Sequence, residues 1–542
     1  MSRRSSFGII VLFVALVGLS LGVTDFCQAT PQKGGTIIEA MGTEPTNLDC
    51  FKAARRPEFT VLHLMFEPLF VVNPDLKIVP MLVESYKSSP DAVTWTFVIK
   101  KGIKFHDGTP LNAEAVKFSL EKHIKGSQGR FLKIIKEITV KDPYTVVMTL
   151  KKSNPLLLNA LSSPNIGMVS PTAYNKAPKQ WGSKVIVGTG PMMFKEWRSG
   201  DRVIMVRNPD YKHAPAWTVN KGPAYVDQWI IRFLPEPTTL IAELTAGDVD
   251  LSDYVTERDV KRVKKAKKTN LIVSPSTSAI FLAINTKNPP FNDVKIREAA
   301  AHAISAGGVR KAAMNDIGAP LYTPISFNIL GFWKPSDDIG KPLVKYDLEK
   351  AKAILEAAGW KDTNGDGVRE KDGKELFVNF LAFNIARYKR MGEVATPMLE
   401  KAGFKVKLQI LEPGDLYQRT LAGKHNLLST GLVGSQGFAV DDLVSTMHSG
   451  SLGTIAQWCH YTNSEIDKLL DNARYSSDPK KREEALNAAQ KMAAAEIIVI
   501  PMANAMEIFG YKKHLGGVDN YLKHPWAFAQ ADAYRALEIY KK

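Results

Sequence analysis

The sequence predicts a mixed α/β fold with several sheets, and three observations lead to this fold class. Residues 93–99 alternate between large apolar and polar side chains, which is typical of a half-buried strand. From residue 280 onward, short apolar runs alternate with longer helical patterns. The composition, with 45% hydrophobic and 23% charged residues, is that of a globular protein. Its 542 residues predict roughly two to four domains.

In the first half of the chain we expect strands, one capped helix and a hairpin. The first strand is expected at residues 34–40, after the turn at Gly34-Gly35. Asn112 is expected to cap a helix that begins at Ala113. Residues 192–197 and 202–207 flank a Ser-Gly-Asp turn, and this spacing predicts a β-hairpin.

The second half predicts strands and helices in alternation. A strand is expected at 280–284 and a helix at 294–304, and Asp347 is expected to cap a helix that Gly359 ends. The remaining expected elements are a helix at 391–401, a strand at 404–411, a helix capped by Ser464, a helix opened by Asp478-Pro479 and ending at Ala495, and a buried strand at 497–500.

The N-terminus has the pattern of a secretory signal peptide at residues 1–29. Arg3 and Arg4 precede an apolar stretch of 15 residues, Ile9 to Val23, and small side chains suit cleavage after Ala29. An uncleaved membrane anchor is the alternative, and the polar residues directly after the apolar stretch disfavour it. We therefore expect an exported, periplasmic protein.

The chain is basic, with 71 Lys and Arg against 55 Asp and Glu, a net charge of +16. No nucleic-acid-binding module is present, so we expect no nucleic-acid partner. Six cations lie between Lys261 and Lys268, and we interpret this run as a solvated helix face. A basic balance can also aid encounters with anionic surfaces or ligands.

Enzyme and cofactor motifs are missing from the sequence. It has no HExxH, CxxC, Walker loop, GxGxxG or GxSxG pattern, so we expect neither catalysis nor a bound cofactor. Residues 362–367 match the first half of a calcium loop, but Gly373 stands where a bidentate Glu is needed. We interpret that segment as a turn. His448, Cys459 and His460 could together provide soft ligands for a metal.

Several motifs, in order along the chain, resemble family 5 extracellular solute-binding proteins, the peptide, nickel and related receptors of ABC importers. The motifs are Pro80 to Ser85, Trp95 to Glu114, Gly188-Thr-Gly-Pro191, Arg207 to Tyr211, Gly247-Asp-Val-Asp250, and Asn285 to Lys287 with Pro290-Phe291 and Val294 to Arg297. Together they cover nearly the whole mature chain.

This resemblance implies a type II periplasmic-binding-protein-like fold, with two lobes, a hinge and an extra domain, of the three-domain cluster C type. The implied ranges are 33–70, 188–273 and 500–542 for domain I, 71–187 for the extra domain II, and 274–499 for domain III. Gly188 to Pro191 is interpreted as a crossing between lobes. The resemblance also implies a monomer that closes on its ligand between domains I and III and docks on a membrane permease.

The sequence departs from the family pattern at residues that the resemblance places in contact with the ligand. Peptide-binding members often carry Gly-Trp-x-x-Asp, whose Asp pairs with the peptide ammonium, whereas this chain has Leu432 and Ser435 at those positions. Either Asp441 or Asp442 substitutes, or the ligand is not a peptide with a free amino end.

Other ligand-contact candidates come from family position: Thr43 and Glu44 after the first strand, the aromatic residues Phe327 and Trp333, and Trp458. If residues 43–51 and residues 431–460 both line the cleft, Cys50 and Cys459 could form a disulfide. Three functions remain open: a peptide receptor of an importer, a nickel or metal-chelate receptor of the same fold, and an exported hydrolase, which the missing motifs disfavour.

Overall fold

The computed structural model describes residues 31–75, 77–329, 331–332, 344–433, 438–454, 456–522 and 532–542. The expected signal peptide lies outside these ranges, and so do Trp333 and Ser435. Within them, no helix is long and apolar enough to cross a membrane.

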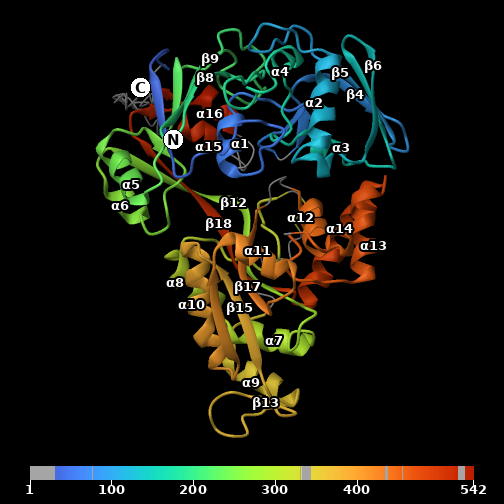
Figure 1. The fold of residues 1–542 in the computed structure, drawn as a ribbon, viewed down its shortest axis with the longest axis vertical. Helices are drawn as coiled ribbons and strands as arrows, with labels where there is room; N and C mark the ends of the chain where they lie inside the picture. The colour runs from blue at the N-terminus through green and yellow to red at the C-terminus, as the bar shows by residue number, and fades with distance from the viewer. Residues whose placement is uncertain are drawn as a thin grey trace, which may run out of the picture.

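Two bodies are joined by two long strands, β12 (Thr269–Ile284) and β18 (Val499–Lys512), as Figure 1 shows. These strands lie at the centre of a ten-stranded sheet with the order β16-β15-β17-β12-β18-β11-β1-β10-β9-β8. We call the body around β1 and β8 to β11 lobe 1, and the body around β15 to β17 lobe 2. The mixed α/β class with several sheets is thereby confirmed.

Lobe 1 carries one end of the large sheet. Its strands are β1 (Thr36–Met41), β8 (Met192–Arg198), β9 (Arg202–Arg207), β10 (Gln228–Phe233) and β11 (Leu251–Ser252). Strand β1 pairs in parallel with β10, and β8 and β9 form the expected hairpin. The helices of this part are α1 (Arg56–Leu62), α5 (Pro237–Ala246), α6 (Val260–Lys265), α15 (Val518–Leu522) and α16 (Asp532–Glu538), with the short strands β19 (Leu515–Gly516) and β20 (Tyr540–Lys541).

A second sheet, with the order β4-β5-β7-β6, belongs to the same lobe. It contains β4 (Val83–Ser88), β5 (Thr94–Ile99), β6 (Ile135–Asp142) and β7 (Thr145–Leu150), and the pair β2 (Phe70–Val72) and β3 (Ile78–Pro80) precedes it. Its helices are α2 (Ala113–Lys125), α3 (Leu157–Leu161) and α4 (Pro171–Lys176), and the Asn112 side chain caps α2 as expected. One apolar cluster runs through both sheets of lobe 1.

Lobe 2 has helices on both faces of its part of the large sheet. The strands are β15 (Phe377–Phe383), β16 (Lys405–Leu411) and β17 (Leu427–Val433), with a small hairpin of β13 (Glu370–Lys371) and β14 (Lys374–Glu375). The helices are α7 (Val294–Ala303), α8 (Ala306–Met314), α9 (Leu348–Ala357), α10 (Ala386–Glu400), α11 (Pro413–Leu421), α12 (Ala439–Met447), α13 (Ser464–Tyr475) and α14 (Pro479–Ala495). Two apolar clusters form its interior.

Two local expectations were wrong, and two expected strands were too short. The strands expected at 280–284 and 497–500 correspond to the lobe 2 ends of the longer strands β12 and β18. The cap of α13 is Asn463, whose side chain accepts from two backbone N–H groups, and not Ser464. Gly188 to Pro191 does not cross between lobes but packs inside lobe 1, where a Cβ on Gly188 would lie 2.1 Å from the Met65 carbonyl oxygen. Glycine is needed there for close backbone approach.

Candidate ligand-binding cleft

The connection between the lobes is an irregular point in the pairing of β12 and β18. The antiparallel register shifts between Pro275 and Ala279, and a second shift follows Ile280. On one side of this point β18 pairs with β11 of lobe 1, and on the other side β12 pairs with β17 of lobe 2. The strands therefore pass from one lobe to the other here, and a local break in regular pairing makes this segment the natural place for bending.

Asn504 of β18 fixes the surroundings of this crossing. Its side chain is fully buried, and its amide donates to the carbonyl oxygens of Ser276 at 2.9 Å and Ala505 at 3.1 Å. Its Oδ1 accepts from the Ser326 hydroxyl at 2.5 Å and from the Phe327 backbone N–H at 3.2 Å. Asn504 thus links β12 and β18, which we call the hinge strands, to the loop that contains Phe327.

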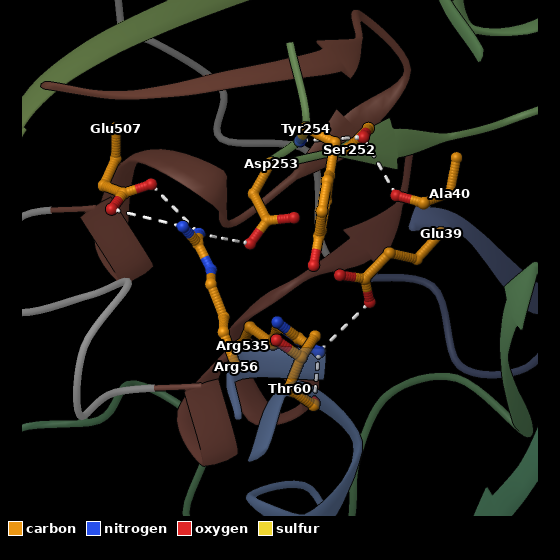
Figure 2. Close-up of polar contacts among 9 residues, drawn as sticks. All are labelled: Glu39, Ala40, Arg56, Thr60, Ser252, Asp253, Tyr254, Glu507 and Arg535. Carbon is orange, nitrogen blue, oxygen red and sulfur yellow. Dashed lines mark hydrogen bonds and ion pairs between the residues drawn. The ribbon is translucent and has the colours of Figure 1, made fainter. Parts of the chain in front are cut away.

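A charged cluster lies beside the crossing on the lobe 1 side. The Arg56 guanidinium bridges Asp253 at 2.8 Å and Glu507 at 3.0 Å, as Figure 2 shows. Arg56 opens α1, and Glu507 lies on β18, so the cluster joins lobe 1 to a hinge strand. The Asp253 side chain is only 4% exposed. Its Oδ1 has no hydrogen-bond partner within the described part of the chain, which leaves a buried acceptor available.

The lobes also touch away from the hinge. The Lys152 ammonium lies 3.5 Å from the centre of the Tyr475 ring, which joins the second sheet of lobe 1 to the end of α13. An apolar cluster spans the same gap, with Val72, Ile78 and Leu156 from lobe 1 and Phe438, Val440, Ala473 and Leu486 from lobe 2 among its members. These contacts hold the lobes close together.

A further contact across the gap is the ion pair between Arg387 of α10 and Glu257, which precedes α6. Both side chains are partly buried, at 28% and 17% exposure. The two lobes therefore meet through an ion pair as well as through the apolar and cation–π contacts.

A hollow of about 820 Å³ opens between the lobes beside the apolar contact. Its walls come from Lys77, Ile78, Leu156 and Asn159 of lobe 1 and from residues of α12, α13 and α14 in lobe 2. Ligand sites in proteins are concave, mostly apolar and preferentially placed between domains. The gap between the lobes is therefore the candidate ligand-binding cleft.

The candidates that follow the first strand have different surroundings. Thr43 is exposed. The Glu44 carboxylate accepts from the Trp197 indole N–H at 3.0 Å and from the Gly200 backbone N–H at 3.1 and 3.0 Å, so it supports the β8–β9 hairpin. These contacts give Glu44 a structural role, and a role in ligand binding stays a prediction for both residues.

The candidates around the missing family Asp lie on β17 and α12. Leu432 is buried and pairs with Ala279 at the crossing. Asp441 pairs with Arg474 at 3.5 Å, and Asp442 is buried in the first turn of α12. Ser435 lies outside the described residues.

The described aromatic candidates lie close to the crossing. Phe327 is half-buried and edge-on to Phe332, with ring centres 6.5 Å apart. Trp458 packs against Phe281 of β12, with ring centres 6.1 Å apart. Its indole N–H has no hydrogen-bond partner among the residues that the structure describes. Trp333 lies outside those residues.

The expected soft metal site does not form. Cys459 is buried and donates to the Ile498 carbonyl oxygen, while His460 Nε2 lies 2.7 Å from the Thr420 carbonyl oxygen. His448 lies instead near Asp467 and Asp471. Of the described residues, only Asp362, Asp366 and Glu370 form a group of three or more that could hold a metal ion. Asp362 there accepts from the N–H groups of Gly365 and Gly367, as a turn requires.

The possible disulfide between Cys50 and Cys459 does not form either, because both cysteines are free and buried. Cys50 belongs to the apolar cluster of lobe 1 and Cys459 to a cluster of lobe 2. Burial raises the pKa of both thiols, that of Cys459 to about 12. Such thiols pack as small apolar side chains and are unreactive.

Sequence reasoning missed Arg56, Asp253, Glu507, Asn504 and Arg387. These residues form no local motif, because their partners lie far away along the chain. The only available signal was position: Asp253 follows the Gly247 to Asp250 motif by three residues.

Comparisons with known proteins place this architecture among binding proteins. Residues 77–453 match the family described as bacterial extracellular solute-binding proteins, family 5 middle. The chain is similar to the oligopeptide-binding protein AppA of Bacillus subtilis (strain 168), with 29% identity over 502 residues, covering 89% of this chain and 90% of AppA. It is also similar to the glutathione-binding protein GsiB of Escherichia coli (strain K12), with 26% identity, covering 89% of this chain and 91% of GsiB.

Solved structures show the same fold. AppA from Bacillus subtilis in complex with a nonapeptide matches with a TM-score of 0.76 and 26% identity, covering 95% of this chain and 100% of that chain. NikA from Brucella suis in complex with Fe(III)-EDTA matches with a TM-score of 0.78 and 21% identity, covering 89% and 96%. The type II, multi-domain fold is thereby confirmed.

Proposed function

The chain belongs to the bacterial extracellular solute-binding proteins of family 5, and from this premise we propose that it captures a peptide or peptide-like solute between its lobes for an ABC importer. The observation that carries the proposal is the hollow of about 820 Å³ between the two lobes, which β12 and β18 join. The similarity to AppA over nearly the whole chain supports the peptide class.

Binding and closure are coupled in this proposal. Bending at the shifted register near Pro275 changes the angle between lobes, and Asn504 keeps the strands together as they bend. The contacts Lys152–Tyr475 and Arg387–Glu257 exist only when the lobes are close. A ligand that touches both lobes binds the closed form better and shifts the population toward it.

We also propose that this chain does not require a free amino end on its peptide. Ser435 stands at the position where peptide-binding members of the family often carry Asp. Asp441, which follows it in the sequence, already pairs with Arg474. A buried ammonium without a carboxylate partner would be costly. The cleft is then expected to recognise the extended backbone and side chains, with Phe327 and Trp458 as aromatic contacts and with Leu432 and Asp442 nearby.

The test is titration of the mature protein with matched peptides whose amino ends are free or acetylated. Calorimetry should show binding of both forms, with dissociation constants that agree within about threefold, a difference of under 1 kcal/mol. Small-angle scattering should show a more compact protein on saturation. Failure of a broad peptide mixture to bind would contradict the proposed function, while a strong preference for the free amine would contradict only the statement about the amino end.

The cellular setting is part of the same proposal. We propose cleavage of residues 1–29, a periplasmic location, a monomeric state and delivery to permease subunits. We keep the division into domain I (33–70, 188–273, 500–542), domain II (71–187) and domain III (274–499). The second sheet within 71–187 and the strands β15 to β17 within 274–499 support it. Cell fractionation and N-terminal sequencing of the mature chain would test export.

A further inference from the structure

A basic groove lies on lobe 1, built from three turns that are far apart in the sequence. They are the end of α5 at residues 246–248, the link between α6 and β12 with Lys267 and Lys268, and the turn after β18 at residues 512–514. The groove has a volume of about 540 Å³. Backbone hydrogen bonds join the turns, because the Lys513 N–H donates to the Lys268 carbonyl oxygen at 3.0 Å and the Lys512 N–H to that of Asp250 at 2.8 Å.

Lys512 is the central cation of this groove. The residue is only 5% exposed, and no hydrogen bond or ion pair joins its ammonium to another described residue. The side chain lies over Gly247, where an added Cβ would stand 2.8 Å from Nζ. Burial lowers the pKa of Lys512, which the neighbouring Asp250 and Asp248 partly oppose. An ammonium that lines a hollow and makes no close ion pair with a described residue attracts an anion.

Carboxylates around the groove do not neutralise it. Asp250 already interacts with His514 at 3.1 Å and Lys541 at 3.4 Å, and its carboxylate accepts from the Ile38 N–H. Asp248 is the one acidic side chain among the residues that line the groove. The lining cations are Lys267, Lys268, Lys512 and Lys513.

The positive charge continues beyond the groove along α6. Lys261, Arg262, Lys264 and Lys265 are exposed. This helix lies on the flank of lobe 1, as Figure 1 shows. A single small anion would use the groove alone, whereas a surface that carries many anionic groups would also use the cations of α6. Clusters of four to eight Lys or Arg are typical of segments that bind anionic lipids.

We propose that this groove binds the phosphate-bearing head group of an anionic phospholipid and that α6 lies against the surrounding membrane surface. The site would hold lobe 1 at the membrane while lobe 2 stays free to move, because every residue involved belongs to lobe 1 or to the lobe 1 ends of the hinge strands. It does not depend on which solute occupies the cleft.

The experiment is co-sedimentation of the mature protein with vesicles of phosphatidylcholine alone and of phosphatidylcholine mixed with phosphatidylglycerol. We expect binding only to the anionic vesicles, weakened by salt. The double variant Lys267→Glu/Lys268→Glu should weaken binding by at least roughly tenfold. The matched control Lys133→Glu/Lys136→Glu changes exposed lysines of the second sheet region by the same charge, and it should change binding less than about twofold.

A second variant and two competitors keep the outcome clear. Lys512→Gln should weaken vesicle binding without reversing any charge, and a thermal melt of each variant reports whether it folds. Equal losses in the groove and control variants would show attraction by net charge alone and overturn the proposal. Inorganic phosphate that displaces the vesicles at low concentration would indicate a site for a free anion, and binding of an acidic peptide in place of vesicles would indicate a protein partner; either result would overturn it.

Discussion

Both lobes have apolar interiors, but lobe 1 buries both partners of an ion pair, whereas in lobe 2 the buried Arg297 pairs with a partly exposed carboxylate. In lobe 1, buried charges meet inside the core: Glu39 pairs with Arg535 at 3.1 Å, with side chains 1% and 2% exposed, and accepts from the Trp229 indole N–H. Figure 2 shows Arg535 also donating to the Thr60 carbonyl oxygen. In lobe 2, two apolar clusters form the interior.

Glu67 repeats the pattern of lobe 1. Its carboxylate, almost fully buried, accepts from the hydroxyls of Thr189 and Tyr211, and its Oε2 lies 2.7 Å from His213 Nε2. These partners come from separate stretches of the chain, as do those of Glu39. A buried ion pair adds little net stability but penalises wrong arrangements. Lobe 1, assembled from remote segments, uses such pairs to specify which segments meet, whereas lobe 2 is one continuous stretch.

The largest expected effect is the loss of stability when the buried ion pair of lobe 1 is removed, and it tests this contrast directly. Glu39→Ala removes the buried carboxylate that lies 3.1 Å from Arg535 and accepts from Trp229, and it should cost about 3–5 kcal/mol of unfolding free energy. In lobe 2, Arg297, 4% exposed, pairs with Glu496, 38% exposed, and also donates to the Glu496 and Phe291 backbone carbonyl oxygens, which remain in a Glu496 variant. Glu496→Gln should therefore cost only about 1 kcal/mol. Urea unfolding followed by Trp fluorescence measures both, and equal losses would show that the lobes do not differ in this way.

An effect of intermediate size is the loss of folding stability at acidic pH, which should occur in both lobes. Burial lowers the pKa of His123 in lobe 1 and of His425 in lobe 2 from 6.5 to about 4. The unfolded chain therefore binds more protons between these pH values, so stability is full above pH 6.5 and falls as the pH drops to about 4. Each residue should account for about 3 kcal/mol.

Melting temperatures of the wild type, His123→Gln and His425→Gln measured across this pH range test that expectation. Each variant should show a shallower acid loss than the wild type. If only one variant does so, the acid response belongs to one lobe and the contrast between the lobes becomes sharper.

The smallest expected effect lies where the lobes meet. Lys152→Ala removes the contact with Tyr475, worth about 0.5–1 kcal/mol, and should weaken solute binding by about threefold because the closed form loses support. Lys151→Ala is the matched control, since the neighbouring lysine is exposed on the same segment. Scattering of the solute-free protein should show a more open form for Lys152→Ala alone, and identical curves would contradict the role of the contact.

Local patterns predicted local structure well. The Asn112 cap, the 192–207 hairpin and the Asp478-Pro479 helix start depend on neighbouring residues, and the structure has all three. The full length of β12 and β18 was missed, because their lobe 1 halves lack a continuous apolar run. The family resemblance predicts a ligand between domains I and III, whereas the hollow between the lobes is lined from lobe 1 by residues of the 71–187 range assigned to domain II. The Arg56 bridge and the Asn504 network depend on partners that only the folded chain brings together.

The paired hinge strands have a further consequence. The chain enters lobe 2 along β12 and leaves along β18, and these strands are hydrogen-bonded neighbours, so the two ends of lobe 2 lie only about 5 Å apart. Lobe 2 is therefore arranged as an insert whose two junctions are side by side. Lobe 2 could therefore be exchanged as a unit between relatives at these two junctions without changing the path of the remaining chain. Such an exchange would also replace the half of the cleft that lobe 2 provides.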